Sequence, residues 1–198
     1  MVTPLSELMT GSTQNIINTY ERATEEQQCG GENWYFAALA LAEELADRHD
    51  LPVTNVANAI AALSPVTDWI TNQIAASEVC ATGFTRFQSG ANIDKANRIL
   101  AGDLKSLRGP KVERFALAIV NPLGDTTACI DRHAFSIWMG TKQTDIQQKV
   151  LARKGAYELV AEAYAEAAKI LDVPVHTVQA VTWIVWRDMH DVVRKIGK

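Results

Sequence analysis

Two stretches of the chain decide which fold its sequence favours: LKSLRGPKVERFA at residues 104–116 and CIDRHA at residues 129–134. The first opens with two leucines three residues apart, which is the spacing of one short helix. Gly109 can take the positive φ of a tight turn, and Pro110 suits the first position of the next helix because its missing N–H needs no partner there. The stretch therefore predicts two short helices joined by a turn at Gly109 and Pro110.

Basic residues crowd this helical hairpin, although the chain as a whole is acidic, with a net charge of −4. Six basic side chains and only two acidic ones lie from Lys95 to Arg114. The N-terminus of a helix offers free N–H groups and positive partial charge, which suit a phosphate. With Lys105, Arg108 and Lys111 around it, the hairpin predicts contact with a phosphate backbone. The alternative is an ordinary solvated helix face.

The second stretch places Asp131 directly after a short apolar run and at the start of a helix that Gly140 ends. Aspartate is an ordinary N-cap residue, because its carboxylate accepts hydrogen bonds from the first N–H groups of a helix. Capping alone accounts for Asp131 as an isolated residue. Its position shortly after the basic hairpin makes it a candidate for chemistry as well.

Helical spacing recurs along the chain and strand alternation is almost absent, so the sequence predicts an all-α fold. A helix over residues 67–79 is expected to bury Ile70, Ile74 and Val79, and Thr54 is expected to cap the helix before it. The other expected helices cover residues 34–48, 54–64, 92–101, 131–140, 155–171 and 174–193.

A turn sequence occurs twice in the chain. Asp50–Val53 reads DLPV and Asp172–Val175 reads DVPV, and each follows an alanine-rich amphipathic helix and precedes another helix. Because it occurs only twice, this echo predicts a reused helix–turn–helix geometry rather than a tandem repeat. No linker separates two domains. We expect one helical domain over residues 1–198, with lobes formed by 1–50 plus 141–198 and by 51–140.

Composition excludes several classes of protein. With 47% hydrophobic and 21% charged residues the chain is globular, and it lacks an apolar run of about 18 residues, so no membrane partner is expected. Cys29, Cys80 and Cys129 are too few and too far apart for a disulfide framework or a zinc or iron–sulfur site, and the histidines lack ligand spacing. We therefore expect no metal and no cofactor. The first residues lack the basic and apolar regions of a signal peptide, so a reduced, cytoplasmic protein is expected.

Taken together, the two stretches resemble the helix-hairpin-helix DNA glycosylase superfamily. In that superfamily a Leu-x-x-Leu-Pro-Gly-Val-Gly hairpin grips the DNA backbone, and a catalytic aspartate follows inside Val-Asp-Thr-His. Residues 104–111 stand in for the hairpin here, and Ile130–His133 stands in for the aspartate motif. The resemblance implies two helical lobes around a cleft and DNA as the partner. It also implies an enzyme that hydrolyses the N-glycosidic bond of a damaged or modified base.

The resemblance assigns roles to individual residues. Asp131 takes the catalytic position, and Glu113, eighteen residues before it, lies where members with lyase activity carry a lysine. Without that lysine no Schiff base forms, so a monofunctional glycosylase is expected; Lys111 is a candidate substitute and completes the catalytic set. The segment LSPVTDWITN at 63–72 resembles the one that lines the superfamily's base pocket. The expected DNA-binding residues are Lys105, Arg108, Gly109, Lys111, Arg114 and Arg132, and the expected base-pocket residues are Pro65, Thr67, Asp68, Trp69, Asn72 and His133.

The hairpin departs from the superfamily pattern, since Lys111 replaces its second glycine and Pro110 removes one N–H donor. Phosphate contact is therefore expected to rely more on side chains than on the backbone. Trp69, Trp34 and Tyr35 are candidate stacking walls for an extruded base, or else core residues. Two other functions stay open: a DNA base-modifying enzyme on the same fold, similar to the amino acid:DNA transferases of phages, and a non-catalytic DNA-binding module. The identity of the base and the oligomeric state are also open.

Overall fold

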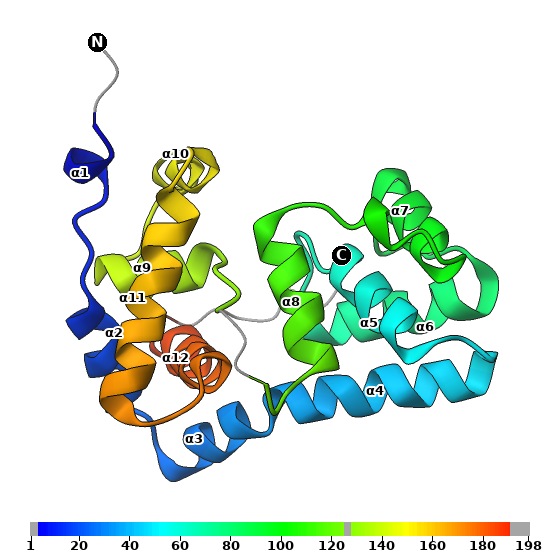
Figure 1. Cartoon of the computed structure of the whole chain (residues 1–198), viewed down its shortest axis with the longest axis horizontal. Helices are drawn as coiled ribbons and strands as arrows, with labels where there is room; N and C mark the ends of the chain where they lie inside the picture. Colours follow the sequence, from blue (N-terminus) through cyan, green and yellow to red (C-terminus); the bar gives the residue numbers. More distant parts are fainter. Residues whose placement is uncertain (1–3, 125–127, 191–198) are drawn as a thin grey trace. The chain divides into compact units, whose positions relative to one another are not determined.

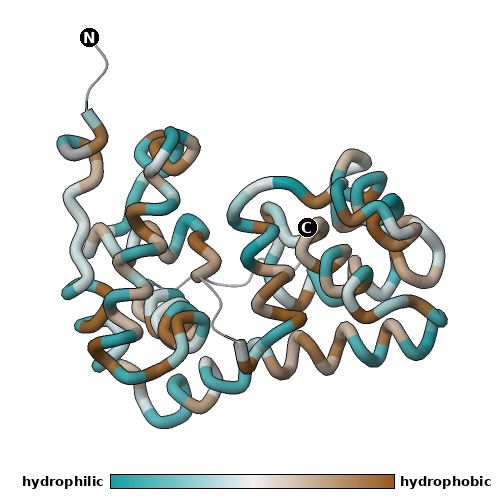
Figure 2. Tube along the Cα trace, viewed as in Figure 1, coloured by the Kyte–Doolittle hydropathy of each residue, from teal (hydrophilic) through white to brown (hydrophobic). Residues whose placement is uncertain are grey.

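The computed structural model describes residues 4–124 and 128–190, and within these ranges the regular structure is entirely helical (Figure 1). The prediction of an all-α protein is therefore confirmed. Hydrophobic and hydrophilic residues alternate along the helices instead of forming long apolar runs (Figure 2). In the described part of the chain, no helix combines the length and the apolar character that crossing a membrane requires.

The chain divides into two compact units, which are described separately. The terminal unit comprises Met1–Trp34 and Asp125–Lys198, and the central unit comprises Tyr35–Gly124. These boundaries differ from the lobes expected from the sequence. Helix α4 (Trp34–His49) belongs to the central unit except for its first residue, and α9 (Arg132–Met139) belongs to the terminal unit, where it packs against helices from both ends of the chain.

Helix α5 (Val53–Ala62) is the core of the central unit. Seven of its ten residues are buried, and it packs against the other helices of the unit after α4. These are α6 (Trp69–Thr82), α7 (Gly90–Leu100) and α8 (Pro110–Val120). Two amides fasten them: Asn55 Nδ2 donates to the Leu100 carbonyl at 3.3 Å, and Asn72 Nδ2 donates to the Ile60 carbonyl at 3.1 Å.

Helix α12 (Val175–Met189) has the corresponding place in the terminal unit. Nine of its residues are buried, and it packs against α2 (Thr13–Tyr20), α3 (Glu25–Glu32), α9 and α11 (Ala156–Leu171). A side chain at Gly31 would collide with Val181, so α3 approaches α12 closely only because this residue is glycine. The remaining short helices of the unit are α1 (Leu5–Leu8), α10 (Asp145–Gln148) and the 3₁₀ turn η2 (Lys149–Ala152).

The reused helix–turn–helix geometry is present at both predicted places. Asp50 has φ 53° and Asp172 has φ 55°, so each ends its helix in the left-handed conformation. The next N–H donates to a carbonyl five residues back, from Leu51 at 2.9 Å and from Val173 at 3.1 Å. A proline then occupies the N-cap position of α5 and of α12.

Three details of the sequence prediction are wrong. Pro52, rather than Thr54, lies at the N-cap of α5, because the helix already begins at Val53. Ile70 and Ile74 remain 44% and 43% exposed, because the buried face of α6 consists of Asn72, Ala75, Ala76 and Val79. The helices α1 to α3 were not expected; capping by Ser12 and Thr24 starts α2 and α3. The end of the helix expected over 174–193 lies outside the described residues.

Candidate functional site

The predicted helical hairpin lies in the central unit. Its first helix is a single 3₁₀ turn, η1 (Leu104–Ser106), and its second is α8, which begins at Pro110. Gly109 joins them with φ 115° and ψ 135° and has no crowding neighbour, so its backbone angle rather than space requires glycine. The turn at Gly109 and Pro110 is therefore confirmed.

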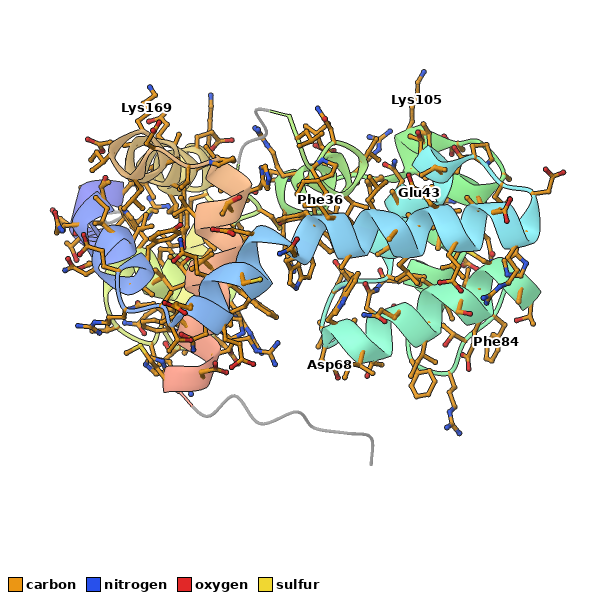
Figure 3. All side chains as sticks on the ribbon, turned by 90° about the horizontal axis from the view of Figure 1, so that it is seen from below. Phe36, Glu43, Asp68, Phe84, Lys105 and Lys169 are labelled. Carbon is orange, nitrogen blue, oxygen red and sulfur yellow. The ribbon has the colours of Figure 1, made fainter. Side chains whose placement is uncertain are left out.

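The basic residues of the hairpin differ in exposure. Lys105 and Arg108 are exposed, whereas Lys111 and Arg114 are half-buried. Arg108 Nε donates to the Lys105 carbonyl at 3.2 Å and so closes the turn, and the Lys105 side chain extends away from the ribbon (Figure 3). A phosphate that approaches the hairpin from solvent would meet the two exposed side chains first.

Glu113 has a partner that its position in the sequence did not reveal. The Gly109 N–H donates to Glu113 Oε1 at 3.1 Å, so the carboxylate folds back onto the start of its own helix. A negative charge is favourable there, because the first N–H groups of a helix carry positive partial charge. Glu113 thus covers one donor of the hairpin that a phosphate would use, and Pro110 lacks another.

The segment expected to line a base pocket is also in the central unit. Gln88 Nε2 donates to the carbonyls of Leu63 at 2.7 Å and Pro65 at 2.8 Å, which fixes the loop before α6. Val66 at its tip has φ 61° and is fully exposed. A β-branched residue in the left-handed region is strained, so the two bonds from Gln88 hold a loop that its own sequence does not favour.

Asp68 is the N-cap of α6 (Figure 3). Its carboxylate accepts from the Thr71 N–H at 3.0 Å and from the Thr71 hydroxyl at 2.9 Å. Partial burial raises the pKa of Asp68, but hydrogen bonds from Thr71 and Ile70 outweigh burial, and its pKa lies below the ordinary value. Asp68 is therefore an ionised cap of its own helix, and Thr67 beside it donates weakly to the Asp68 carbonyl.

Three aromatic residues of the central unit, Tyr35, Trp69 and Phe115, form a cluster. The Trp69 ring meets the Phe115 ring edge-on at 6.5 Å, and the Tyr35 ring meets Phe115 at 6.3 Å. Tyr35 is only 2% exposed and belongs to the core, whereas Trp69 is half-buried. Asn72 is buried, and its Oδ1 has no hydrogen-bond partner among the described residues.

Asp131 lies in the terminal unit as the N-cap of α9. Its Oδ1 accepts from the N–H groups of His133 and Ala134, both at 2.8 Å. Its Oδ2 accepts from the indole N–H of Trp183 on α12 at 3.2 Å. Both oxygens of this half-buried carboxylate are thus held by fixed donors. The cap was expected from the sequence; the bond from Trp183 was not, because the two residues are 52 positions apart.

Two buried tyrosines support the start of α9. The Tyr157 hydroxyl accepts from the Ile130 N–H at 3.0 Å and donates to the Ala128 carbonyl at 3.1 Å. These two bonds fix the segment that leads to Asp131. The Tyr164 hydroxyl donates to the Ala134 carbonyl at 3.3 Å. Burial raises the pKa of Tyr164, and the charge of Asp131 raises it further. The hydroxyl therefore stays protonated and acts as a hydrogen-bonding group rather than as a charge.

The expected site residues therefore divide between the units. The hairpin residues, Pro65, Thr67, Asp68, Trp69 and Asn72 are in the central unit, and Asp131, Arg132 and His133 are in the terminal unit. Arg132 is exposed and its Nε lies 3.4 Å from Nε2 of the half-buried His133. Among the residues with described positions, no group of three histidine, cysteine, aspartate or glutamate side chains is arranged to hold a metal ion.

The model of a protein family of unknown function, DUF7178, matches residues 3–190. The chain belongs to this family. No curated protein and no solved structure matches the chain.

Proposed function

We propose that this protein is a monofunctional DNA glycosylase, which hydrolyses the N-glycosidic bond of a damaged or modified base. One observation carries the proposal. The N-terminus of α9 and the Trp183 indole fix the two carboxylate oxygens of Asp131, which lies eighteen residues after Glu113. The preceding basic hairpin, with its positive-φ Gly109, supplies the second feature of the superfamily that the sequence resembles.

The chemistry needs a preorganised negative charge. Cleavage of an N-glycosidic bond builds positive charge on the sugar, as in other glycoside hydrolyses. A carboxylate held by fixed donors stabilises this charge without having to reorganise, and it can orient the attacking water. Asp131 is the residue proposed for this role. Lys105 and Arg108 are proposed to contact phosphates, and the half-buried Trp69 to stack against the extruded base.

A second candidate function rests on the same bonds. A purely structural N-cap would make the same two bonds to helix N–H groups, and the bond from Trp183 could simply hold α9 against α12. A DNA-binding module without catalysis would then keep the hairpin and use Asp131 only to start α9. The experiment below separates these two functions.

The first experiment measures base release by mass spectrometry. Wild-type protein, Asp131→Asn and Asp188→Asn would be incubated with duplex oligonucleotides that carry a panel of damaged and hypermodified bases. Asparagine caps a helix about as well as aspartate, so Asp131→Asn keeps the start of α9 while it removes the charge and the acceptor that Oδ2 offers to Trp183. Asp188, an exposed residue of α12 bonded to Gln27, is the matched control for loss of one charge.

We expect wild type and Asp188→Asn to release a free base and leave an intact abasic strand, and Asp131→Asn to be slower by at least about 100-fold. Strand nicking without added base would contradict the monofunctional assignment. If wild type binds DNA but releases nothing, the glycosylase proposal fails. A mass gain on an activated thymine would then identify a transferase. No change in mass would support a DNA-binding module without catalysis.

A further inference from the structure

The bond between Trp183 and Asp131 exceeds what a helix cap requires. Among the described residues, Asp68 is the other aspartate whose side chain accepts N-cap hydrogen bonds, and it satisfies its second oxygen with Thr71 of its own helix. Asp131 instead accepts its third bond from α12, a different helix, at 3.2 Å. An N-cap needs only the bonds to Oδ1, so the contact at Oδ2 fixes the rotation of the carboxylate rather than the start of α9.

The Trp183 ring is itself held from several sides. The guanidinium carbon of Arg187 lies 4.4 Å from the centre of the ring, in a cation–π contact. The Trp34 ring meets it edge-on at 6.4 Å, and the His133 ring meets it at 6.3 Å and 86°. These contacts come from α4, α9 and α12, so the indole N–H cannot turn away from Asp131 without breaking several of them.

We propose that Trp183 is a positioning residue for Asp131: its indole N–H fixes the orientation of the carboxylate that stabilises the sugar cation. This inference rests on the proposed glycosylase function and adds a residue to it. Trp183 contributes no charge, and its indole N–H is engaged by the Asp131 carboxylate. Its loss therefore affects the rate of the chemical step and leaves substrate binding unchanged.

The contact is tested first without a substrate. In ¹⁵N-labelled protein the five tryptophans give five indole N–H resonances. We expect one of them to vanish in Trp183→Phe, and the same resonance to move in Asp131→Asn while it stays in place in Asp188→Asn. An indole resonance of Trp183 that does not respond to Asp131→Asn would overturn the proposal, because the bond would then be absent in solution.

The positioning role is tested next with the base-release assay. Trp183→Phe keeps an aromatic ring for Arg187 and removes the N–H together with one ring of the indole. Trp186→Phe is the matched control, since Trp186 is a buried residue of the same helix that stacks on His190. We expect kcat of Trp183→Phe to fall by about 10- to 100-fold with KM unchanged, and Trp186→Phe to keep both constants.

A merely structural role would lower the melting temperature of Trp183→Phe as much as that of Trp186→Phe and leave kcat intact, and this result would overturn the proposal. If Trp183→Phe does not fold, Arg187→Gln replaces it in the assay. This variant removes the cation–π contact that holds the Trp183 ring but retains the N–H, so a smaller fall in kcat is expected. If wild type releases no base from any substrate, the proposed function fails. The resonance experiment still decides whether Trp183 holds Asp131.

Discussion

The turn from α4 to α5 and the turn from α11 to α12 have the same backbone conformation at their aspartates, but the helices that follow them differ in the side chains they present. Both end a helix with an aspartate at φ close to 54°, and both return an N–H to a carbonyl five residues back. In both, a proline is the N-cap of the next helix, which is the central helix of its unit. The buried residues of helix α5 pack against its neighbours, and apart from Asn55 they are alanine, valine and isoleucine. Helix α12 is also largely buried, but it presents in addition Trp183, which bonds to the cap of α9, and Arg187, which lies over the Trp183 ring.

This difference separates the features that position a helix from the side chains that the helix presents. The turn sets the direction of the central helix in both units, whereas the half-buried side chains on the edge of that helix decide whether it can also support a site. A site therefore requires residues that packing alone would not select, such as a tryptophan with its N–H pointed at a carboxylate.

The largest expected effect tests whether the two turns are equivalent. Asp50→Val and Asp172→Val should each lower the free energy of unfolding by about 2 kcal/mol, because a β-branched residue is strained at positive φ. Asp50→Gly and Asp172→Gly should be close to neutral, since glycine takes this conformation freely but is more flexible when unfolded.

Chemical denaturation measures these changes. Circular dichroism follows both units, and tryptophan fluorescence mainly follows the terminal unit, which contains every tryptophan except Trp69. Asp47→Val, at an exposed position inside α4, is the control and should cost less than about 0.5 kcal/mol. Costs at Asp50 and Asp172 that differ by more than about 1 kcal/mol would break the comparison between the turns.

A smaller effect sharpens the comparison between the two capping aspartates. Asp68→Ala should cost about 1 kcal/mol at pH 6, through the loss of the cap of α6. Because the pKa of Asp68 is lowered in the folded protein, its stabilisation is present above the ordinary value of 3.8 and disappears as the pH falls through the lower folded value.

The free energy of unfolding of wild type and Asp68→Ala should therefore converge as the pH is lowered from 6 towards 3. Asp47→Ala, which removes an exposed carboxylate without a capping role, is measured alongside. A difference between wild type and Asp68→Ala that stays constant over this range would show that the carboxylate charge contributes nothing to the cap.

The smallest expected effect concerns the carboxylate at the start of α8. Glu113→Gln weakens the bond to the Gly109 N–H and makes this donor available to a phosphate, so DNA affinity should rise by about two- to fivefold. Asp103→Asn removes one negative charge from the same hairpin, but Asp103 bonds to the Ser106 hydroxyl instead of the backbone.

Fluorescence anisotropy of labelled duplex DNA at one fixed salt concentration gives both affinities. An equal gain in the two variants would mean that only net charge matters. A loss of affinity in Glu113→Gln would contradict this prediction and would mean that the Glu113 carboxylate itself supports DNA binding.

Much of the local structure followed from the sequence, because it depends on neighbouring residues. The turn at Gly109 and Pro110, the cap at Asp131 and the two aspartate–proline turns each rest on the conformational preference of a few residues. The buried face of α6 was assigned wrongly for the converse reason: hydropathy favoured Ile70 and Ile74, but contact with α5 and α7 selected the smaller Ala75 and Ala76.

The sequence by itself determined that the chain is helical, where several of its helices begin and end, and that Asp131 caps one of them. Only the tertiary structure decided which helices share a unit, that Glu113 folds onto Gly109, and that Trp183 holds Asp131. Caps and turns are set by interactions within about five residues, which a pattern can express. A bond between residues 52 positions apart exists only after packing has brought α9 and α12 together.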